Sequence, residues 1–229
     1  MSSWPSTPEE LIAVQLRLAI ATPEPWTPTP AALVGGCFVC FARGAHGPGS
    51  RGDRGWAAAS LGGEVAVVRG AAGAPYEAGL LALREGALLA EAVATLEGVP
   101  DVLLVNATGR DHPRRAGLAL QLGAALGVPT VGVTHRPLLA RGVWPADELG
   151  ASSPLLVDGA RVGSWLRTRP GTRPLAVHAA WCTHADAAIE LVRSVTRGAR
   201  TPEPLRAARR AAREARAADE PRGRGRDAP

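Results

Sequence analysis

Residues 101–117 have the sequence DVLLVNATGRDHPRRAG, in which a short apolar run is followed by a polar loop. An apolar run of this length that ends in polar residues is typical of a strand buried at the centre of a sheet. A Leu- and Ala-rich segment with helical spacing, 80–96, comes before it, and an apolar helix over 115–126 and a second buried strand over 130–135 come after it. This alternation predicts parallel strands connected by helices.

The flanking segments predict the rest of the sheet. On the N-terminal side we expect a capped helix, an apolar strand, an exposed loop and two paired strands, at 7–21, 32–41, 43–55, 56–61 and 64–69. On the C-terminal side we expect three short strands and a last helix, at 154–158, 161–167, 174–178 and 185–196. Antiparallel strands followed by alternating helices and strands predict an α/β protein with a mixed sheet flanked by helices.

The length and the cysteine content limit the class of protein. A chain of 229 residues is long enough for one domain with a substantial core and too short for two ordinary ones. No apolar run reaches the roughly 18 residues that a membrane span needs, and the N-terminus lacks the pattern of a signal peptide, so we expect a cytoplasmic protein without membrane contact. Cys37 and Cys40 fall in a predicted strand at an odd separation, which places them on opposite faces and argues against zinc or redox chemistry.

The basic character of the chain comes from its C-terminal segment. All 26 basic residues are Arg, and the formal net charge is +5 at pH 7. Residues 205–229 contain eight Arg against four acidic residues, a net charge of +4, whereas residues 1–204 contain 18 against 17, a net charge of +1. The charge alone therefore predicts no basic groove in the body of the protein. We expect a domain over 1–204 and an Ala/Arg-rich tail over 205–229 that is mostly disordered.

The loop after the buried strand is the first candidate site. A polar loop at the carboxyl end of a central strand is where α/β folds bind ligands. His112, Arg114 and Arg115 supply three donors around a rigid proline, and guanidinium groups bind phosphate bidentately. The alternative is a solvated loop that caps the following helix, and the residue types by themselves leave both interpretations open.

Three motifs together resemble the Endonuclease V family: HPRRAG after the buried strand, TVGVTHRPL after the next helix, and APYEAGLLALRE before the strand. The order and spacing of the match extend over about residues 8–204, and TPEPLRAA at 201–208 resembles the C-terminal signature of the family. The resemblance implies a ribonuclease-H-like fold and metal-dependent cleavage of a phosphodiester on the 3′ side of deoxyinosine, or of inosine in RNA. It also implies Mg²⁺ or Mn²⁺ as cofactor and DNA or RNA as partner, and we expect a monomer.

The resemblance places the metal ligands on three elements, and only one of the acids is retained. Glu85 matches the acid of the family's helix and is implied as a catalytic residue and metal ligand, whereas Phe38 and Asn106 stand where the family has Asp. His135 and Trp181 replace a Lys and a His of the family. Convergent carboxylates hold hydrated Mg²⁺, so the loss of two predicts weak metal binding and impaired cleavage. Two other acids could substitute as ligands, Asp53 and Asp111.

The recognition residues match the family better. Pro75 and Tyr76 correspond to the start of a segment that inserts beside the lesion and helps to turn the base out of the stack, and Tyr76 is the only Tyr in the chain. The following residues, Glu77 and Ala78, depart from the family pattern. The retained loop residues predict phosphate contact or a retained loop shape; they are Gly109, His112, Pro113, Arg114 and Arg115.

Three hypotheses for the function follow. The leading one is a protein related to Endonuclease V that binds nucleic acid without efficient cleavage. The second is an active endonuclease of that family with substitute metal ligands. The third is a noncatalytic scaffold for protein interactions.

Overall fold

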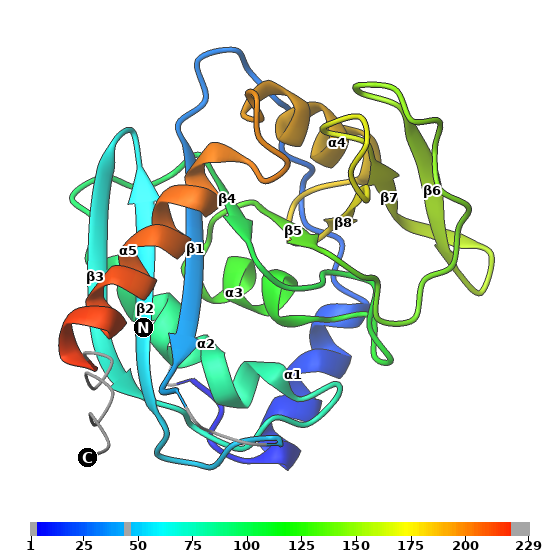
Figure 1. Cartoon of the computed structure of the whole chain (residues 1–229). Coiled ribbons are helices and arrows are strands. Elements are labelled where there is room, and N and C mark those ends of the chain that lie inside the picture. The colour runs from blue at the N-terminus through cyan, green and yellow to red at the C-terminus, as the bar shows by residue number, and fades with distance from the viewer. Residues whose placement is uncertain (1–3, 44–46, 221–229) are drawn as a thin grey trace, which may run out of the picture.

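The structure is a computed structural model that describes residues 4–43 and 47–220 (Figure 1). One eight-stranded sheet has the strand order β3-β2-β1-β4-β5-β8-β7-β6. Its strands are β1 (Val34–Phe41), β2 (Arg54–Leu61), β3 (Glu64–Ala71), β4 (Val102–Val105), β5 (Thr130–Thr134), β6 (Ser152–Val157), β7 (Ala160–Leu166) and β8 (Leu175–Ala179). The helices are α1 (Pro8–Ala19), α2 (Leu81–Ala94), α3 (Leu118–Leu126), α4 (Ala185–Ser194) and α5 (Glu203–Asp219).

The strand pairing confirms the predicted α/β mixed sheet. β1 pairs antiparallel with β2 and parallel with β4, and β4 pairs parallel with β5. β3 extends the sheet antiparallel on one side, while β8, β7 and β6 extend it antiparallel on the other. The carboxyl ends of β4 and β5 therefore lie next to each other in the middle of the sheet, which is where the predicted loop begins.

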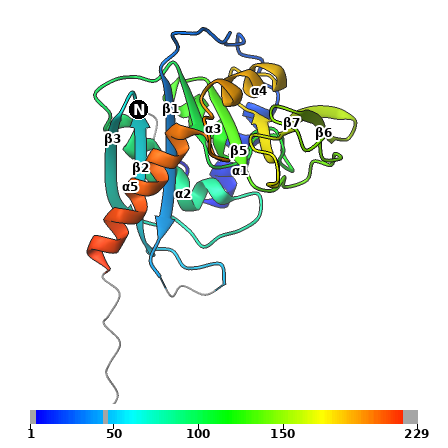
Figure 2. The same cartoon turned by 45° about the horizontal axis from the view of Figure 1, so that its top comes forward.

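Helices cover both faces of the sheet (Figures 1 and 2). The alternation of side chains along β4 shows the two layers, because successive side chains of a strand point to opposite faces. Leu103 and Val105 belong to a core with residues of α1, α2 and α3, whereas Val102 and Leu104 belong to a second core with residues of α4 and α5. Both cores rest on Leu, Val and Ala, and the β4 side chains between them are fully buried.

The two cysteines of β1 lie on opposite faces of the strand, as their odd separation predicts. Cys37 packs in the core on the side of α2, and Cys40 packs with Trp56 on the side of α5. Both thiols are buried and free. Within the described part of the chain, no helix combines the length and the apolar character that a membrane crossing requires.

The prediction of a disordered tail from residue 205 is wrong for the part of the tail that the structure describes. Residues 203–219 form α5, which lies across β1 and β2 and buries Leu205, Ala208 and Ala212 against the sheet. The approach is close because β1 has a glycine there: a Cβ on Gly36 would lie 2.5 Å from the carbonyl carbon of Pro204. The helix is therefore part of the folded domain, so residue 204 is not a domain boundary. Residues 221–229 lie outside the described residues.

Candidate nucleic-acid interface

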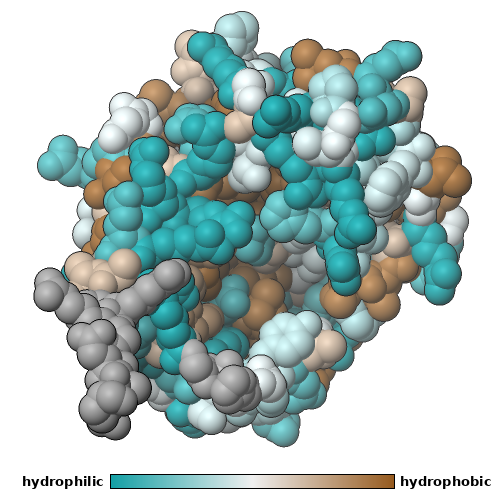
Figure 3. Space-filling view, viewed as in Figure 1, coloured by the Kyte–Doolittle hydropathy of each residue, from teal (hydrophilic) through white to brown (hydrophobic). Residues whose placement is uncertain are grey.

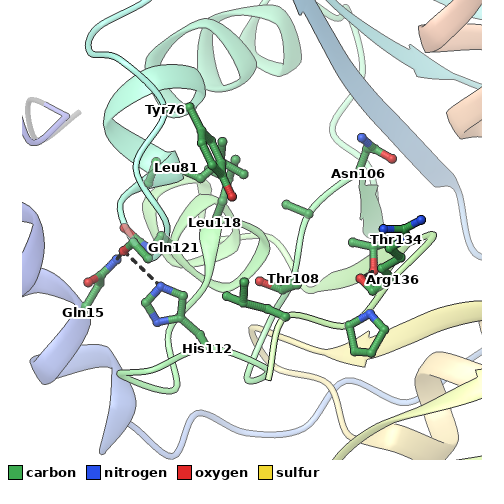
Figure 4. Close-up of a pocket in the computed structure, with 15 residues that line it drawn as sticks. Gln15, Tyr76, Leu81, Asn106, Thr108, His112, Leu118, Gln121, Thr134 and Arg136 are labelled. Atoms are coloured by element: carbon green, nitrogen blue, oxygen red, sulfur yellow. Dashed lines mark hydrogen bonds between the residues drawn. The ribbon is translucent and has the colours of Figure 1, made fainter. Parts of the chain in front are cut away.

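A pocket opens at the carboxyl ends of β4 and β5, where the sequence predicted a ligand (Figure 4). Its volume is about 180 Å³. Six segments line it: α1, the connection from β3 to α2, the start of α2, the β4 end with its loop, the start of α3, and the end of β5 with the residues that follow it. The residues that matter below are Gln15, Tyr76, Gly79, Asn106, His112 and Thr134.

Tyr76 is the aromatic side chain of this pocket. It lies in the connection between β3 and α2, and 49% of it is exposed. Its backbone N–H donates to the carbonyl oxygen of Pro48 at 2.7 Å, which fixes the residue against a neighbouring loop. The ring extends into the pocket beside Leu81 and Leu118 (Figure 4). One face of a flat group that enters the pocket could therefore stack on this ring.

The segment that carries Tyr76 has a second anchor at the carbonyl oxygen of Gly79. Three donors converge on it: Nε2 of Gln15 at 2.9 Å, Nε2 of His112 at 3.0 Å and Nη2 of Arg114 at 3.0 Å. The Arg114 guanidinium also donates through Nε to Oε1 of Gln15. These bonds join α1, the loop after β4 and the Tyr76 segment, so the pocket wall is held by a buried polar network.

The network fixes the tautomer of His112. Nδ1 accepts a hydrogen bond from the backbone N–H of Arg114 at 3.1 Å, so the ring proton is on Nε2, which donates to Gly79. A second proton on Nδ1 would oppose the Arg114 N–H. Burial, with the nearby Arg114 charge, accordingly lowers the pKa of His112 to about 4, and the imidazole is neutral at physiological pH.

The retained loop residues make contacts within the protein. Arg115 donates from Nη2 to Oδ2 of Asp158 at 2.8 Å, and the Arg114 guanidinium is occupied as described above. Gly109 is required by close approach, because a Cβ there would lie 2.1 Å from the carbonyl oxygen of Ala179. In the structure His112, Arg114 and Gly109 make internal contacts that hold the shape of the loop. Pro75 and Tyr76 remain exposed.

The two positions at which the resemblance implies metal-binding Asp residues lie together in a small cleft beside the pocket. Phe38 and Asn106 line this cleft, whose volume is about 10 Å³, together with His135. Two Arg side chains of α5 lie over the Phe38 ring: Cζ is 5.6 Å from the ring centroid for Arg209 and 5.8 Å for Arg213. Sequence reasoning missed both Arg residues because it placed them in a disordered tail.

Glu85 does not line the cleft that Phe38 and Asn106 share. It lies on α2 close to the buried thiol of Cys37. Burial raises the pKa of this thiol, and the Glu85 charge raises it further. Burial raises the pKa of Glu85 itself to about 7, against the opposing effect of Arg84. Near neutral pH this carboxyl is therefore partly protonated, which weakens it as a ligand for a cation.

The two candidate substitute acids are engaged elsewhere. Asp53 accepts from Nη2 of Arg84 at 2.8 Å and from the backbone N–H of Ser50 at 2.8 Å. Asp111 is fully buried and accepts from three successive backbone N–H groups, at 138, 139 and 140. Over residues 4–43 and 47–220, no three side chains of His, Cys, Asp or Glu are grouped so that they could hold a metal ion. The donor set does not fit Mg²⁺ or Mn²⁺.

Trp181, at the position of the family's His, faces the apolar core. It packs against the cluster formed with α1, α2 and α3, and its backbone N–H donates to Oγ1 of Thr130 at 3.1 Å. His135 stays at the cleft, and burial together with Arg200 and Arg209 lowers its pKa. Neither side chain brings an acid to the substituted metal positions.

The order of strands and helices, with a pocket at the carboxyl ends of β4 and β5, defines an α/β protein with a mixed eight-stranded sheet and a ligand-sized pocket at its centre. The family model described as Endonuclease V matches residues 58–210. Endonuclease V of Methanopyrus kandleri is 43% identical over 143 residues, which are 62% of this chain and 61% of that protein. This alignment thus spans about three fifths of the relative's length. The chain belongs to the Endonuclease V family.

Solved structures extend the likeness to nearly the whole chain. The Endonuclease V structure from Streptomyces avermitilis is 32% identical with a TM-score of 0.80, and the match covers 94% of this chain and 95% of that one. Endonuclease V of Ciona intestinalis, determined with a 24mer DNA that contains an inosine followed by a ribo-adenosine, is 18% identical with a TM-score of 0.74. That match covers 93% of this chain and 98% of the Ciona chain, and shows the shared fold.

Proposed function

We propose that this protein binds inosine-containing DNA or RNA and does not cleave it efficiently. The observation that carries the proposal is a base-sized pocket that adjoins a cleft lined by Phe38 and Asn106, the residues that stand where the resemblance implies metal-binding Asp. The Ciona relative supports the choice of ligand, since its structure was determined with inosine-containing DNA. We expect the protein to act as a cytoplasmic monomer.

The size and lining of the pocket support the binding of an unstacked base. A cavity of about 150 Å³ lined by apolar side chains holds a benzene ring, so about 180 Å³ gives room for a planar heterocycle. Stacking of a base on an aromatic side chain contributes about 1–3 kcal/mol. Tyr76 offers such a face, and a poorly paired base such as hypoxanthine costs less to unstack than a matched one.

The chemistry of the substituted positions supports the loss of cleavage. A Phe side chain has no lone pair for a metal ion, and an Asn offers one neutral oxygen in place of a carboxylate. At an effective dielectric constant of about 20, each missing carboxylate removes several kcal/mol of attraction to a divalent ion before desolvation is counted. Glu85 alone, with its raised pKa, does not restore this charge.

The other two hypotheses have less support. An active enzyme with substitute ligands would need Asp53 or Asp111, and each already accepts hydrogen bonds that would have to break. A pure interaction scaffold would have no need for an anchored Tyr76 segment beside a pocket.

Fluorescence anisotropy with labelled oligonucleotides tests the binding half of the proposal. The protein is titrated, with a chelator present, into DNA and RNA strands and duplexes that contain one inosine, and into matched controls that carry guanosine instead. We expect tighter binding to the inosine-containing member of each pair. Equal affinity within every pair would remove the role in lesion recognition, and absence of binding to all of them would favour the scaffold hypothesis.

A further inference from the structure

The outer surface of α5 is a row of five arginines, and within the described part of the chain Arg206 is the only one of them that forms an ion pair with a carboxylate. Figure 3 shows hydrophilic side chains gathered along this helix beside a hollow with a hydrophobic floor. Arg206 pairs with Glu203 at 2.9 Å, and Arg216 donates to the carbonyl oxygen of Phe41 at 3.0 Å. Over residues 4–43 and 47–220, neither Arg209 nor Arg213 forms an ion pair with a carboxylate.

Phe38 holds these two guanidinium groups in place. Both lie within 6 Å of its ring centroid, at 5.6 Å and 5.8 Å, which is the range of a cation–π interaction. Nε of Arg209 is buried and has no hydrogen-bond partner among the described residues. Leaving a buried charged donor without an acceptor is unfavourable, so this arrangement favours an anion that would accept from it.

The cleft below Arg209 is lined by polar side chains and no acid. Its polar lining consists of an amide, two hydroxyls, an imidazole and the guanidinium, from Asn106, Thr134, Thr201, His135 and Arg209. A volume of about 10 Å³ accepts an atom the size of a water oxygen. One oxygen of a phosphate group could enter it while the rest of the group stays under the arginines. Burial and the neighbouring Arg200 and Arg209 charges lower the pKa of His135, as expected for a cationic cluster.

The cleft and the Tyr76 pocket adjoin each other, because Asn106 and Thr134 line both. A nucleotide whose base enters the larger pocket would therefore have its backbone at the cleft. This continuity favours a phosphodiester of a strand over an isolated anion.

We propose that Arg209 and Arg213, positioned by Phe38, bind a backbone phosphate of the nucleic acid without a metal ion. Phe38, which stands where the resemblance implies an Asp, thus positions two guanidinium groups that supply the positive charge at the phosphate. This inference rests on the proposed function, since it assigns a phosphate site next to the proposed base pocket.

Binding of inosine-containing duplex and single-stranded DNA to three variants tests the inference, measured by anisotropy in EDTA and over a range of salt. Arg209→Gln should weaken binding about tenfold or more, and should reduce the salt slope of log affinity on the duplex by about 0.9. Phe38→Leu, which keeps an apolar side chain and removes the ring, should weaken binding about threefold. Arg210→Gln is the matched control: the residue is exposed on the same helix and lines a different cavity, so less than a twofold effect is expected.

Two outcomes would overturn the assignment. One is an equal loss for Arg209→Gln and Arg210→Gln, which would indicate general charge attraction. The other is binding by the unmodified protein that disappears in EDTA and returns with Mg²⁺.

A second measurement separates this inference from the proposed function. Thermal unfolding in inorganic phosphate is compared with unfolding in chloride at equal ionic strength. If the unmodified protein binds no oligonucleotide but phosphate stabilises it more than it stabilises Arg209→Gln, the anion site stands and the nucleic-acid function fails. If phosphate gives no such difference and no oligonucleotide binds, both fail.

Discussion

Replacing His112 by Gln should change how stability depends on pH, because the folded protein holds this imidazole in its neutral form. The pKa of His112 falls from 6.5 to about 4 on folding. The unfolded chain therefore binds more protons than the folded one between these values. The stabilisation that the neutral ring provides is complete above pH 6.5 and is lost as the pH falls towards 4.

The size of the effect follows from the two pKa values. By linkage, protonation of the unfolded state alone removes about 2 kcal/mol of unfolding free energy at pH 5, and about 3 kcal/mol is the limit well below pH 4. His112→Gln also loses hydrogen bonds in the Gly79 network, so it should be less stable at pH 7.5. The gap between the two proteins should shrink by about 2 kcal/mol between pH 7.5 and pH 5.

Urea unfolding at several pH values measures this gap. Glu85, with its raised pKa, titrates in the same range with the opposite sign, but it is present in both proteins and cancels in the difference. Gln15→Leu is the control, since it removes another donor to the Gly79 carbonyl and no titratable group. Its gap to the unmodified protein should not depend on pH. A gap for His112→Gln that is equally constant would refute the proposed neutral tautomer.

Three further predictions concern α5, the pocket and the metal positions. Leu205→Ala should lower the free energy of unfolding by about 2–5 kcal/mol in urea denaturation, because Leu205 is buried between α5 and the sheet; a loss below 1 kcal/mol would contradict that packing. Tyr76→Ala should weaken binding to inosine-containing DNA by about 1–3 kcal/mol. Trp144→Ala, the control at an exposed Trp outside the pocket, should leave this binding unchanged, and equal effects of the two variants would exclude stacking of a base on Tyr76. Calorimetric titration of the unmodified protein with Mn²⁺ should give no saturable site below millimolar concentration, whereas the double variant Phe38→Asp with Asn106→Asp should have one. Saturable binding by the unmodified protein would contradict the conclusion that its donor set does not fit Mn²⁺.

The order of elements could be predicted because each one has a strong local pattern. The apolar run before Asn106 and the Pro and Gly residues around it define β4 and its neighbours, and the observed bounds lie within about three residues of the expected ones. The position of the pocket also followed, since loops at the carboxyl ends of adjacent parallel strands converge.

The helix α5 could not be predicted by the same reasoning, because its buried face is formed by small side chains. Leu205, Ala208 and Ala212 follow helical spacing, but Ala carries little apolar signal in an Arg-rich sequence. These residues are buried because Gly36 allows the helix to approach the sheet closely. The helical spacing of these three residues was the available signal for the helix. Because α5 was not predicted, the position of Arg209 and Arg213 over the Phe38 ring was not predicted either.

Residue types also failed to show what the loop arginines contact. A guanidinium suits a phosphate and a backbone carbonyl equally well, so the sequence alone could not decide between them. In the structure Arg114 is bound to Gly79 and Gln15, which are distant from it along the chain. Only the fold brings those acceptors together.

Cleavage of inosine-containing DNA and RNA under single-turnover conditions is the most direct test of a family member that binds without cutting. The protein is used in excess over labelled strands, at concentrations where anisotropy shows binding, with Mg²⁺ or Mn²⁺, beside an active Endonuclease V as positive control. We predict bound substrate and no product above the protein-free background over hours. Product formed 3′ to the inosine that disappears in the Glu85→Gln variant would show an active enzyme and contradict the proposal.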